Sequence, residues 1–319
     1  MPKIFKYQMN YPVFFDTKNS LELFSLEENF KFISQLYLKK NLPKVLMFTG
    51  NKGSGKSTLI NHFLYSIFDI DNYDKKTFSI SKNSIILKQF QKNIFSNIIY
   101  INGGDYKSVK IEDIRNLKNQ ILQSTISKKD RFIIFDDIEL FNQNSLNALL
   151  KIIEEPSQKN YFFLINNKGK PLIETIKSRT LEIKIILNEK QRLEIINQLV
   201  NLYKLDLILD PKSSQLSPGN FVKFNFLCRE YDILPINNFE KNLSLLLNLY
   251  KKRKDILIIN LLFYLTDQYL KYIKDKNLLK KDKIFEIKNY ILDNLNNFVL
   301  YNINQNSLIN ALNDKLSYE

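Results

Sequence analysis

A glycine-rich run near the start of this 319-residue chain constrains its fold more than any other feature. It reads Gly50-Asn51-Lys52-Gly53-Ser54-Gly55-Lys56-Ser57-Thr58 and holds three of the chain's seven glycines. Glycines allow backbone N–H groups to converge on phosphate oxygens, and a lysine at the place of Lys56 reaches the terminal phosphates of a nucleotide. The run therefore predicts a phosphate-binding loop whose nine residues contact a nucleotide, with the Ser57 hydroxyl on Mg²⁺.

The segments on either side of this loop have the character that the motif requires. Val45 to Thr49 is a short apolar run typical of a buried strand, and Ser57 to Phe68 has the pattern of a helix. A glycine turn between a strand and a helix can also carry this composition without binding anything. The flanking strand and helix favour the phosphate site.

Predicted strands and helices alternate through the first half of the chain. The strands are expected at 45–49, 98–101, 131–135, 161–165 and 181–185, and the helices at 21–40, 57–68, 110–126 and 143–155. Such alternation predicts a parallel sheet covered by helices on both faces. Residues 69–97 give no clear pattern and are left unassigned.

Predicted strands disappear after residue 187, and helical patterns continue to the end. Helices are expected at 189–202, 221–230, 256–273, 284–300 and 308–316, with a loop over 210–220 and a second boundary near 234. The fold class is therefore α/β followed by all-α, ending in a helical bundle. The helix at 256–273 is apolar nearly all round, which favours the bundle centre or a contact with another subunit.

The chain is strongly basic, with a formal net charge of +14 and a pI near 9.4. Such a charge suits a polyanion such as nucleic acid, whose phosphates attract Lys and Arg without regard to sequence. Lys, Asn, Ile, Phe and Tyr are abundant together, as an A/T-biased coding sequence also produces. Charge alone therefore does not separate a DNA-binding role from a compositional bias.

Other compositional features bear on cell compartment and cofactors. Cys228 is the only cysteine, so one chain can form neither a disulfide nor a cysteine zinc site, and no zinc is expected. The amino terminus lacks an apolar stretch of signal-peptide length, and the apolar segment 256–265 is too short to cross a bilayer. These features predict a soluble, cytoplasmic protein with no membrane partner. The only histidine, His62, is expected to pack or to face solvent.

Two adjacent acids, Asp136 and Asp137, follow the predicted strand 131–135. In nucleotide-hydrolysing sheets, an acid at this place binds Mg²⁺ and a neighbouring acid orients the attacking water. Asp136 is predicted in the first role and Asp137 in the second, although Asp137 is one methylene shorter than glutamate. Taken alone, the pair could equally cap a helix or lie in a solvated turn.

Three segments resemble one known family. They read N-A-L-L-K-I-I-E-E-P at 147–156, F-F-L-I-N-N at 162–167 and I-K-S-R-T at 176–180. They are similar to the bacterial clamp-loader ATPase family of the AAA+ class, whose members carry a near-identical first segment and an S-R-C signature. Here Thr180 replaces the cysteine. The resemblance implies an AAA+ P-loop domain at 1–187, a small helical lid at 188–233 and a helical collar at 234–319.

The resemblance also implies residue roles. Core packing explains most of the helix at 147–156, but it does not explain the polar pair Ser178-Arg179. In the family this arginine reaches the γ-phosphate bound by a neighbouring subunit, so Arg179 is implied to be an arginine finger that acts in trans. A lone arginine in a loop is otherwise usually solvated. Asn167 matches the polar residue that senses the γ-phosphate, and Asn220 stands where ATPase subunits carry an arginine.

Within the family the chain is most similar to the delta-prime type. It is short, ends with the collar and carries a similar segment at 110–115. This implies ATP or ADP with Mg²⁺ as cofactors, and a hetero-pentamer with tau/gamma and delta subunits that loads a sliding clamp onto primed DNA. Four zinc-binding cysteines of many relatives are missing, and Asp137 replaces their glutamate. The chain's own ATPase activity is therefore expected to be weak or absent.

Other classes of function remain open from the residues. One is a self-sufficient ATPase, either the tau/gamma type or another AAA+ remodelling protein, in which Asp137 activates water. A second is a scaffold that no longer uses nucleotide. A small-molecule kinase fits less well, because it needs a lid with several arginines that the helical second half does not offer.

Overall fold

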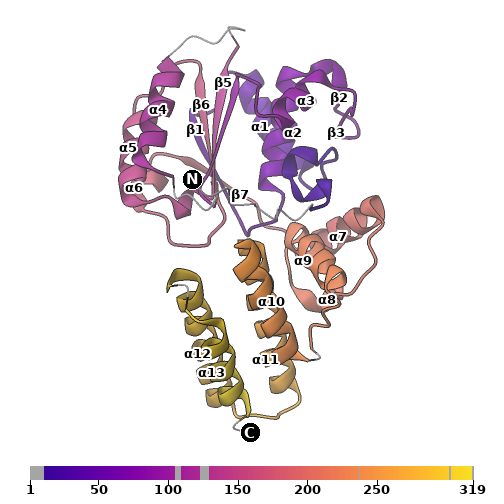
Figure 1. The fold of residues 1–319 in the computed structure, drawn as a ribbon. Helices are drawn as coiled ribbons and strands as arrows, with labels where there is room; N and C mark the ends of the chain where they lie inside the picture. The colour runs from indigo at the N-terminus through magenta and orange to yellow at the C-terminus, as the bar shows by residue number, and fades with distance from the viewer. Residues whose placement is uncertain (1–10, 105–108, 123–128, 237, 302, 318–319) are drawn as a thin grey trace. The chain divides into compact units, whose positions relative to one another are not determined.

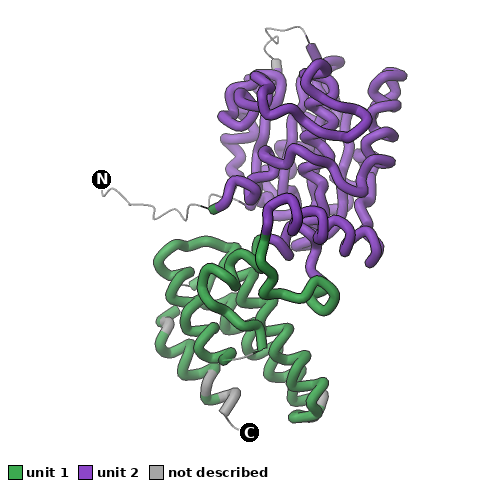
Figure 2. The backbone as a smooth tube through the Cα atoms, turned by 90° about the vertical axis from the view of Figure 1, so that its right-hand side faces the viewer, with its two compact units in different colours: residues 1–11, 205–215, 223–319 green, residues 12–204, 216–222 purple. Residues whose placement is uncertain are grey.

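The computed structural model describes residues 11–104, 109–122, 129–236, 238–301 and 303–317. The chain forms two compact units (Figure 2). One consists of residues 12–204 and 216–222, and the other of the described residues within 1–11, 205–215 and 223–319. The three-domain division expected from the sequence stays a prediction.

The first unit contains a five-stranded sheet in which every strand is parallel to its neighbours (Figure 1). The strand order is β4-β5-β6-β1-β7. The strands are β1 Val45–Thr49, β4 Ile98–Asn102, β5 Arg131–Asp136, β6 Asn160–Asn166 and β7 Leu181–Lys184. This sheet confirms the α/β class and all five predicted strands.

The register of the strands brings their carboxyl ends together. Thr49 pairs with Asn166 across β1 and β6, and Asn102 pairs with Asp136 across β4 and β5. Polar residues that end these strands therefore share one edge of the sheet. In open α/β sheets this edge is where ligands bind.

Helices cover both faces of the sheet, as Figure 1 shows. One face carries α1 Glu27–Leu38, α2 Lys56–Phe68 and α3 Ile85–Gln91, and the other carries α4 Ile111–Leu122, α5 Gln143–Ile153 and α6 Glu174–Lys177. Each face of the sheet has its own hydrophobic core, and alternate residues of β5 point into one or the other. Phe132 and Ile134 lie in the core under α1, α2 and α3, and Ile133 and Phe135 lie in the core under α4, α5 and α6. Burial on both faces explains why the strands are apolar without alternation.

The predicted helix over 21–40 was too long at its start. Leu21 and Leu23 instead bond to the backbone around β3 Ser79–Ile80, through Ile80 N–H to Leu21 O at 2.9 Å and Leu23 N–H to Phe78 O at 3.1 Å. Ser25 then has φ +55°, outside the helical region. These long-range contacts override the local helical pattern, so α1 begins at Glu27.

The segment that the sequence left unassigned is folded. It contains a 3₁₀ helix at Ile70–Asn72, an antiparallel pair formed by β2 Tyr73–Asp74 and β3, and helix α3. Further 3₁₀ turns lie at Val13–Phe15, Thr17–Asn19 and Ile138–Leu140. The predicted helix over 110–126 is present as α4, and its last four residues lie outside the described part of the chain.

The remainder of the chain is helical, as predicted. The helices are α7 Glu189–Tyr203, α8 Pro211–Ser214, α9 Pro218–Glu230, α10 Phe239–Arg253, α11 Ile256–Asp275, α12 Lys281–Tyr301 and α13 Gln305–Ser317. Helix α11 packs against both α10 and α12, which accounts for its apolar surface. Within the described residues, no helix combines the length and the apolar character that a membrane span needs.

The loop predicted over 210–220 was wrong in part. Residues 211–214 form α8, whose amino terminus is capped by the Asp210 carboxylate, and α9 begins at Pro218. Proline is well suited to a first helical turn because its missing N–H would have no intrahelical partner there. Pro218 therefore begins a helix at a position where the sequence pattern predicts a loop.

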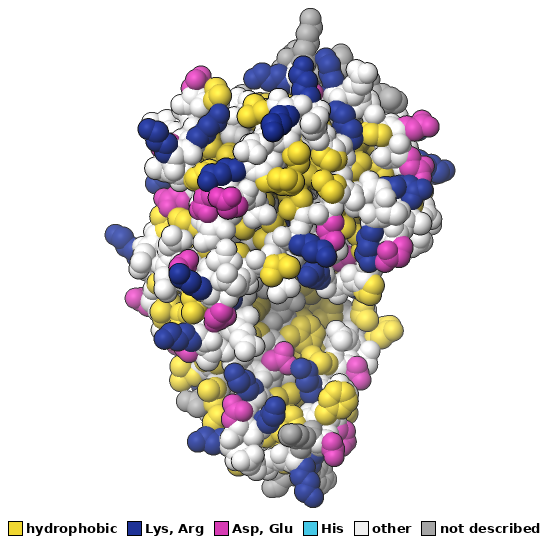
Figure 3. Space-filling view, turned by 180° about the vertical axis from the view of Figure 1, so that it is seen from behind, with side chains coloured by type: hydrophobic (Ala, Val, Ile, Leu, Met, Phe, Trp, Pro, Cys, Tyr) yellow, Lys and Arg dark blue, Asp and Glu magenta, His cyan; other side chains and the backbone are white. Residues whose placement is uncertain are grey.

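The positive charge is not gathered into one patch on the face seen in Figure 3. Lys and Arg side chains are spread over that face, and Asp and Glu side chains lie among them. Interspersed charges of both signs are typical of a solvated surface.

His62 lies inside α2, fully buried, where both ring nitrogens have partners. Nε2 is 3.0 Å from the Ser20 carbonyl oxygen, which can only accept, so Nε2 carries the proton. Nδ1 is 3.2 Å from the Tyr73 hydroxyl and accepts from it. The neutral ring thus satisfies its surroundings, and burial lowers the pKa of His62 from 6.5 to about 4.

This pKa predicts a dependence of stability on pH. Because the folded state disfavours the imidazolium, the unfolded chain binds more protons than the folded chain between pH 4 and 6.5. The free energy of unfolding therefore rises with pH through this window, and the contribution of neutral His62 is complete only above it. Between pH 7.5 and pH 5 the wild type should lose about 2 kcal/mol of unfolding free energy through His62. Urea unfolding of wild type and His62→Gln at both pH values measures this. If the two proteins lost the same unfolding free energy between pH 7.5 and pH 5, the prediction would be contradicted.

Candidate functional site

The glycine-rich run forms the connection between β1 and α2. Residues 50–55 make the loop, and Lys56, Ser57 and Thr58 form the first turn of α2. Gly53 has φ +82° and Gly55 has φ +92°, a backbone region that residues with a Cβ rarely adopt. A side chain at Gly53 would also meet the backbone N of Asn220 at 2.8 Å. Both positions therefore require glycine.

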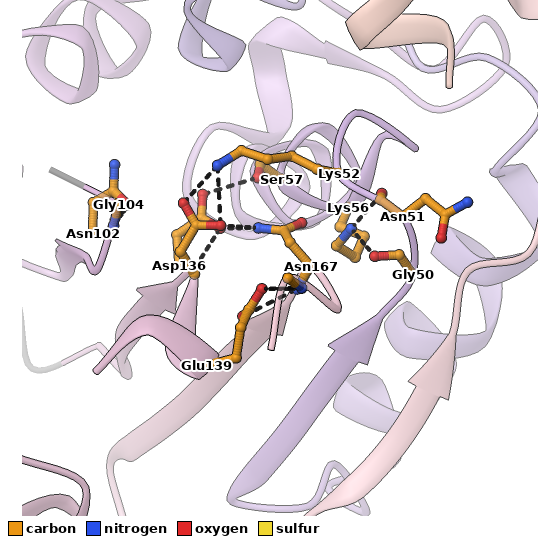
Figure 4. Close-up of polar contacts among 12 residues, drawn as sticks. Gly50, Asn51, Lys52, Lys56, Ser57, Asn102, Gly104, Asp136, Glu139 and Asn167 are labelled. Carbon is orange, nitrogen blue, oxygen red and sulfur yellow. Dashed lines mark hydrogen bonds and ion pairs between the residues drawn. The ribbon is translucent and has the colours of Figure 1, made fainter. Parts of the chain in front are cut away.

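Lys56 is almost completely buried, at 3% exposure, inside the loop (Figure 4). Its ammonium donates hydrogen bonds to the carbonyl oxygens of Gly50 and Asn51, each at 2.8 Å. Burial lowers the pKa of Lys56 to about 8, and the nearby Asp136, Glu139 and Asp137 oppose that shift. The side chain therefore stays mainly cationic at neutral pH, as a phosphate ligand needs to be.

Asp136 ends β5 beside the first turn of α2. Its Oδ2 lies 3.5 Å from the Ser57 hydroxyl and also accepts a hydrogen bond from the Tyr100 hydroxyl on β4. Its Oδ1 accepts from the Asn167 amide at 3.1 Å. A hydroxyl and a carboxylate this close can serve as ligands of one Mg²⁺, which prefers oxygen donors. The two predicted metal residues are thus brought together.

Asp137 follows in a left-handed conformation, with φ +51°, which turns its side chain toward the loop. The carboxylate accepts from the Lys52 ammonium at 2.8 and 3.1 Å and from the Asn167 amide at 2.7 Å. A Cβ on Gly104 would overlap Oδ2 of Asp137, so a larger residue there would require the Asp137 carboxylate to move. Lys52, Asp136, Asp137 and Asn167 therefore form one connected group (Figure 4).

Two further residues contact this group and are not predicted from the sequence. Tyr100 donates to Asp136, and burial together with Asp136 raises the pKa of Tyr100 well above its usual value, so the hydroxyl keeps its proton. Glu139 is buried and accepts the backbone N–H groups of Asn167 at 3.1 Å and Gly169 at 3.0 Å. Glu139 thus fixes the turn after β6 that positions the Asn167 side chain.

The start of α9 lies against the outer side of the loop. Gly219 N–H donates to the Gly53 carbonyl at 2.9 Å, and the Ser217 hydroxyl donates to the Lys52 carbonyl. From α7, the Arg192 guanidinium donates to the Leu216 carbonyl at 3.0 Å. These bonds fix residues 216–222 beside the loop. Asn220 lies in this segment and carries no charge, whereas ATPase subunits of the family carry an arginine at that position.

Arg179 lies apart from this group, just after α6. Its Nε donates to Glu154 Oε1 at 2.9 Å, and one terminal nitrogen donates to the Thr175 carbonyl at 3.0 Å and the Ser178 hydroxyl at 3.3 Å. The side chain is 40% exposed. The structure therefore gives Arg179 no contact with the residues of the phosphate loop among those described, and it leaves part of the guanidinium open to solvent.

The parallel sheet, with a glycine-rich G-x-x-x-x-G-K-S loop between β1 and α2, has the architecture of a P-loop fold. Residues 26–188 match the family described as "DNA polymerase III, delta subunit", and the chain belongs to that family.

The relatives that this chain resembles are named as other subunits of DNA polymerase III. A DNA polymerase III gamma subunit of Buchnera aphidicola is 27% identical over 146 residues, which cover 46% of this chain and 39% of that protein. A delta' subunit from Buchnera aphidicola of Schizaphis graminum is 27% identical over 183 residues, covering 54% and 56%. The matched part thus spans less than two thirds of either relative. A solved gamma-subunit-related protein of Thermotoga maritima has 16% identity and a TM-score of 0.43, covering 90% of this chain and 98% of that one.

Proposed function

We propose that this chain is a delta-prime-type subunit of a DNA polymerase III clamp loader. In this role it joins tau/gamma and delta subunits in a hetero-pentamer that places a sliding clamp on primed DNA in the cytoplasm. The observation that carries the proposal is Arg179, a half-exposed arginine held at the end of α6 away from the chain's own phosphate loop. A cation placed in this way can act on a site that belongs to a neighbour.

The geometry around Arg179 suits an arginine finger. Glu154 and Thr175 fix the Nε side and one terminal nitrogen, so the planar guanidinium is oriented before any partner binds. Arginine keeps its charge at every physiological pH and offers paired donors to phosphate oxygens. Held in this orientation, the group loses little conformational entropy when it meets a γ-phosphate.

The chain's own loop is proposed to bind ATP or ADP. Lys56 and the backbone N–H groups of the loop would contact the phosphates, and Ser57 and Asp136 would hold Mg²⁺, which neutralises phosphate charge. Hydrolysis by the isolated chain is expected to be slow, because Asp137 is shorter than glutamate and its carboxylate is already bonded to Lys52 and Asn167.

A tau/gamma-type ATPase is the second candidate. A complete phosphate loop beside Asp136 and Asn167 favours it, because these residues could support turnover within one chain. The two candidates differ in behaviour. A tau/gamma-type protein would assemble into rings by itself and hydrolyse ATP rapidly, whereas a delta-prime-type protein would need its partners.

Co-expression with the tau/gamma and delta subunits of the same organism tests the proposal. The expected result is a single complex of five subunits containing one copy of this chain, measured by native mass spectrometry. A chain that elutes alone, or that forms rings of its own, would contradict the delta-prime assignment.

A further inference from the structure

Lys52 and Lys56 are both lysines of the phosphate loop, but their ammonium groups have different partners. Lys56 points inward to loop carbonyls, whereas Lys52 reaches across the sheet edge to Asp137 (Figure 4). The Lys52 side chain is 53% exposed, and that of Asp137 is only 6% exposed. The pair therefore joins a half-exposed cation to a buried carboxylate.

The contacts of Asp137 leave it poorly placed to act as a base. A general base has to accept a proton from water at hydrogen-bond distance, through a lone pair directed at that water. In Asp137 both oxygens accept from the Lys52 ammonium, and Oδ1 also accepts from the Asn167 amide. These three hydrogen bonds occupy the lone pairs that a general base would direct at the attacking water.

We propose that Lys52 is a positioning residue that withholds Asp137 from the attacking water. This rests on the proposed function, and it specifies why hydrolysis is slow. The short side chain of Asp137 is then only part of the cause of slow hydrolysis, because the ion pair with Lys52 also holds the carboxylate away from the attacking water. Removal of the Lys52 charge should release an acid that is otherwise competent.

The fold does not depend on the Lys52 side chain. Its backbone is held independently, because the Ser217 hydroxyl donates to the Lys52 carbonyl and Gly219 N–H donates to the next carbonyl, that of Gly53. A substitution of the half-exposed side chain should therefore leave the loop in place. Lys52→Gln removes the charge, and Lys52→Arg keeps it.

The matched control is Lys170→Gln. Lys170 is an exposed lysine on the loop that follows β6, and no ion pair to it occurs in the part of the chain that the structure describes. Its replacement removes the same charge near the same edge of the sheet without touching Asp137. The Lys170→Gln variant should hydrolyse ATP at the wild-type rate.

The test combines calorimetry and ATP turnover on the full-length isolated chain. Lys52→Gln should raise kcat about tenfold or more, which is a part of the roughly 10²–10⁴-fold that a positioned general base supplies, while the loop backbone still binds nucleotide. Asp137→Asn added to Lys52→Gln should remove the gain, and Lys52→Arg should remain slow.

Several results would overturn the inference. A Lys52→Gln variant that binds ATP normally and does not exceed the wild-type kcat would show that Asp137 is not withheld. A large loss of ATP affinity in that variant would make Lys52 a phosphate ligand instead. If the wild-type chain bound no nucleotide, both the proposed function of its loop and this inference would be contradicted. Calorimetry of the wild type distinguishes this outcome from the other two.

Discussion

Arg179→Ala is expected to lower ATP hydrolysis at the neighbouring site by on the order of 10³-fold, the lower end of what an arginine finger contributes. In the proposed role the side chain would stabilise charge on the transferred phosphoryl group, and among the described residues no other arginine lies at the end of α6. The measurement is single-turnover ATP hydrolysis by the reconstituted five-subunit complex, with binding of this chain to its partners checked by gel filtration.

The matched control for Arg179 is Lys177→Ala. Lys177 is a cation two residues earlier, paired with Glu174 at 2.7 Å, and it should affect turnover little. Arg179→Lys keeps the charge but loses the paired donors, so it should recover only part of the rate. A complex that contains Arg179→Ala and hydrolyses ATP at the wild-type rate would exclude the trans role.

Lys56→Ala should reduce nucleotide affinity of the isolated chain by on the order of 10²-fold. Charge-assisted hydrogen bonds contribute about 1.5–3 kcal/mol each, and about 2.7 kcal/mol corresponds to that factor. Calorimetric titration with ATP and Mg²⁺ measures it, and thermal unfolding of the variant checks that the loop still folds. Wild-type affinity in the variant would mean that the loop does not hold phosphate through Lys56.

The pKa of Lys56 adds a second readout to this experiment. Because burial lowers that pKa to about 8, a rise in pH from 7 to 9 removes the proton from most of the unliganded lysine. Wild-type affinity should therefore fall over this interval, and the affinity of Lys56→Ala should change much less. Parallel changes in the two proteins would assign the pH dependence to another group.

Most of the fold could be predicted because it is determined by local patterns. The apolar runs of β1, β5 and β6 are long enough to be recognised, and their alternation with amphipathic helices leaves few arrangements other than a covered parallel sheet. The errors lie where distant segments decide the conformation. Leu21 and Leu23 bond to residues around β3 rather than joining α1, which no periodicity within residues 21–40 could reveal.

The candidate site shows the same division. Motif spacing identifies Lys52 and Ser57, the end of a strand identifies Asp136 and Asp137, and the family resemblance identifies Asn167. The structure brings these five residues together. Their roles in catalysis and binding stay predictions. Tyr100 and Glu139 gave no signal, since a tyrosine within a strand and an acid after a turn are ordinary in sequence. Their contacts with Asp136 and Asn167 exist only after the strands pair.

The central claim is that Arg179 serves a nucleotide bound by another subunit. An electron cryomicroscopy structure of the five-subunit complex with a non-hydrolysable ATP analogue tests it most directly. The account predicts the Arg179 guanidinium about 3 Å from a γ-phosphate oxygen of the adjacent subunit. A structure of this complex in which no phosphate of a neighbouring subunit contacts the Arg179 guanidinium would contradict it.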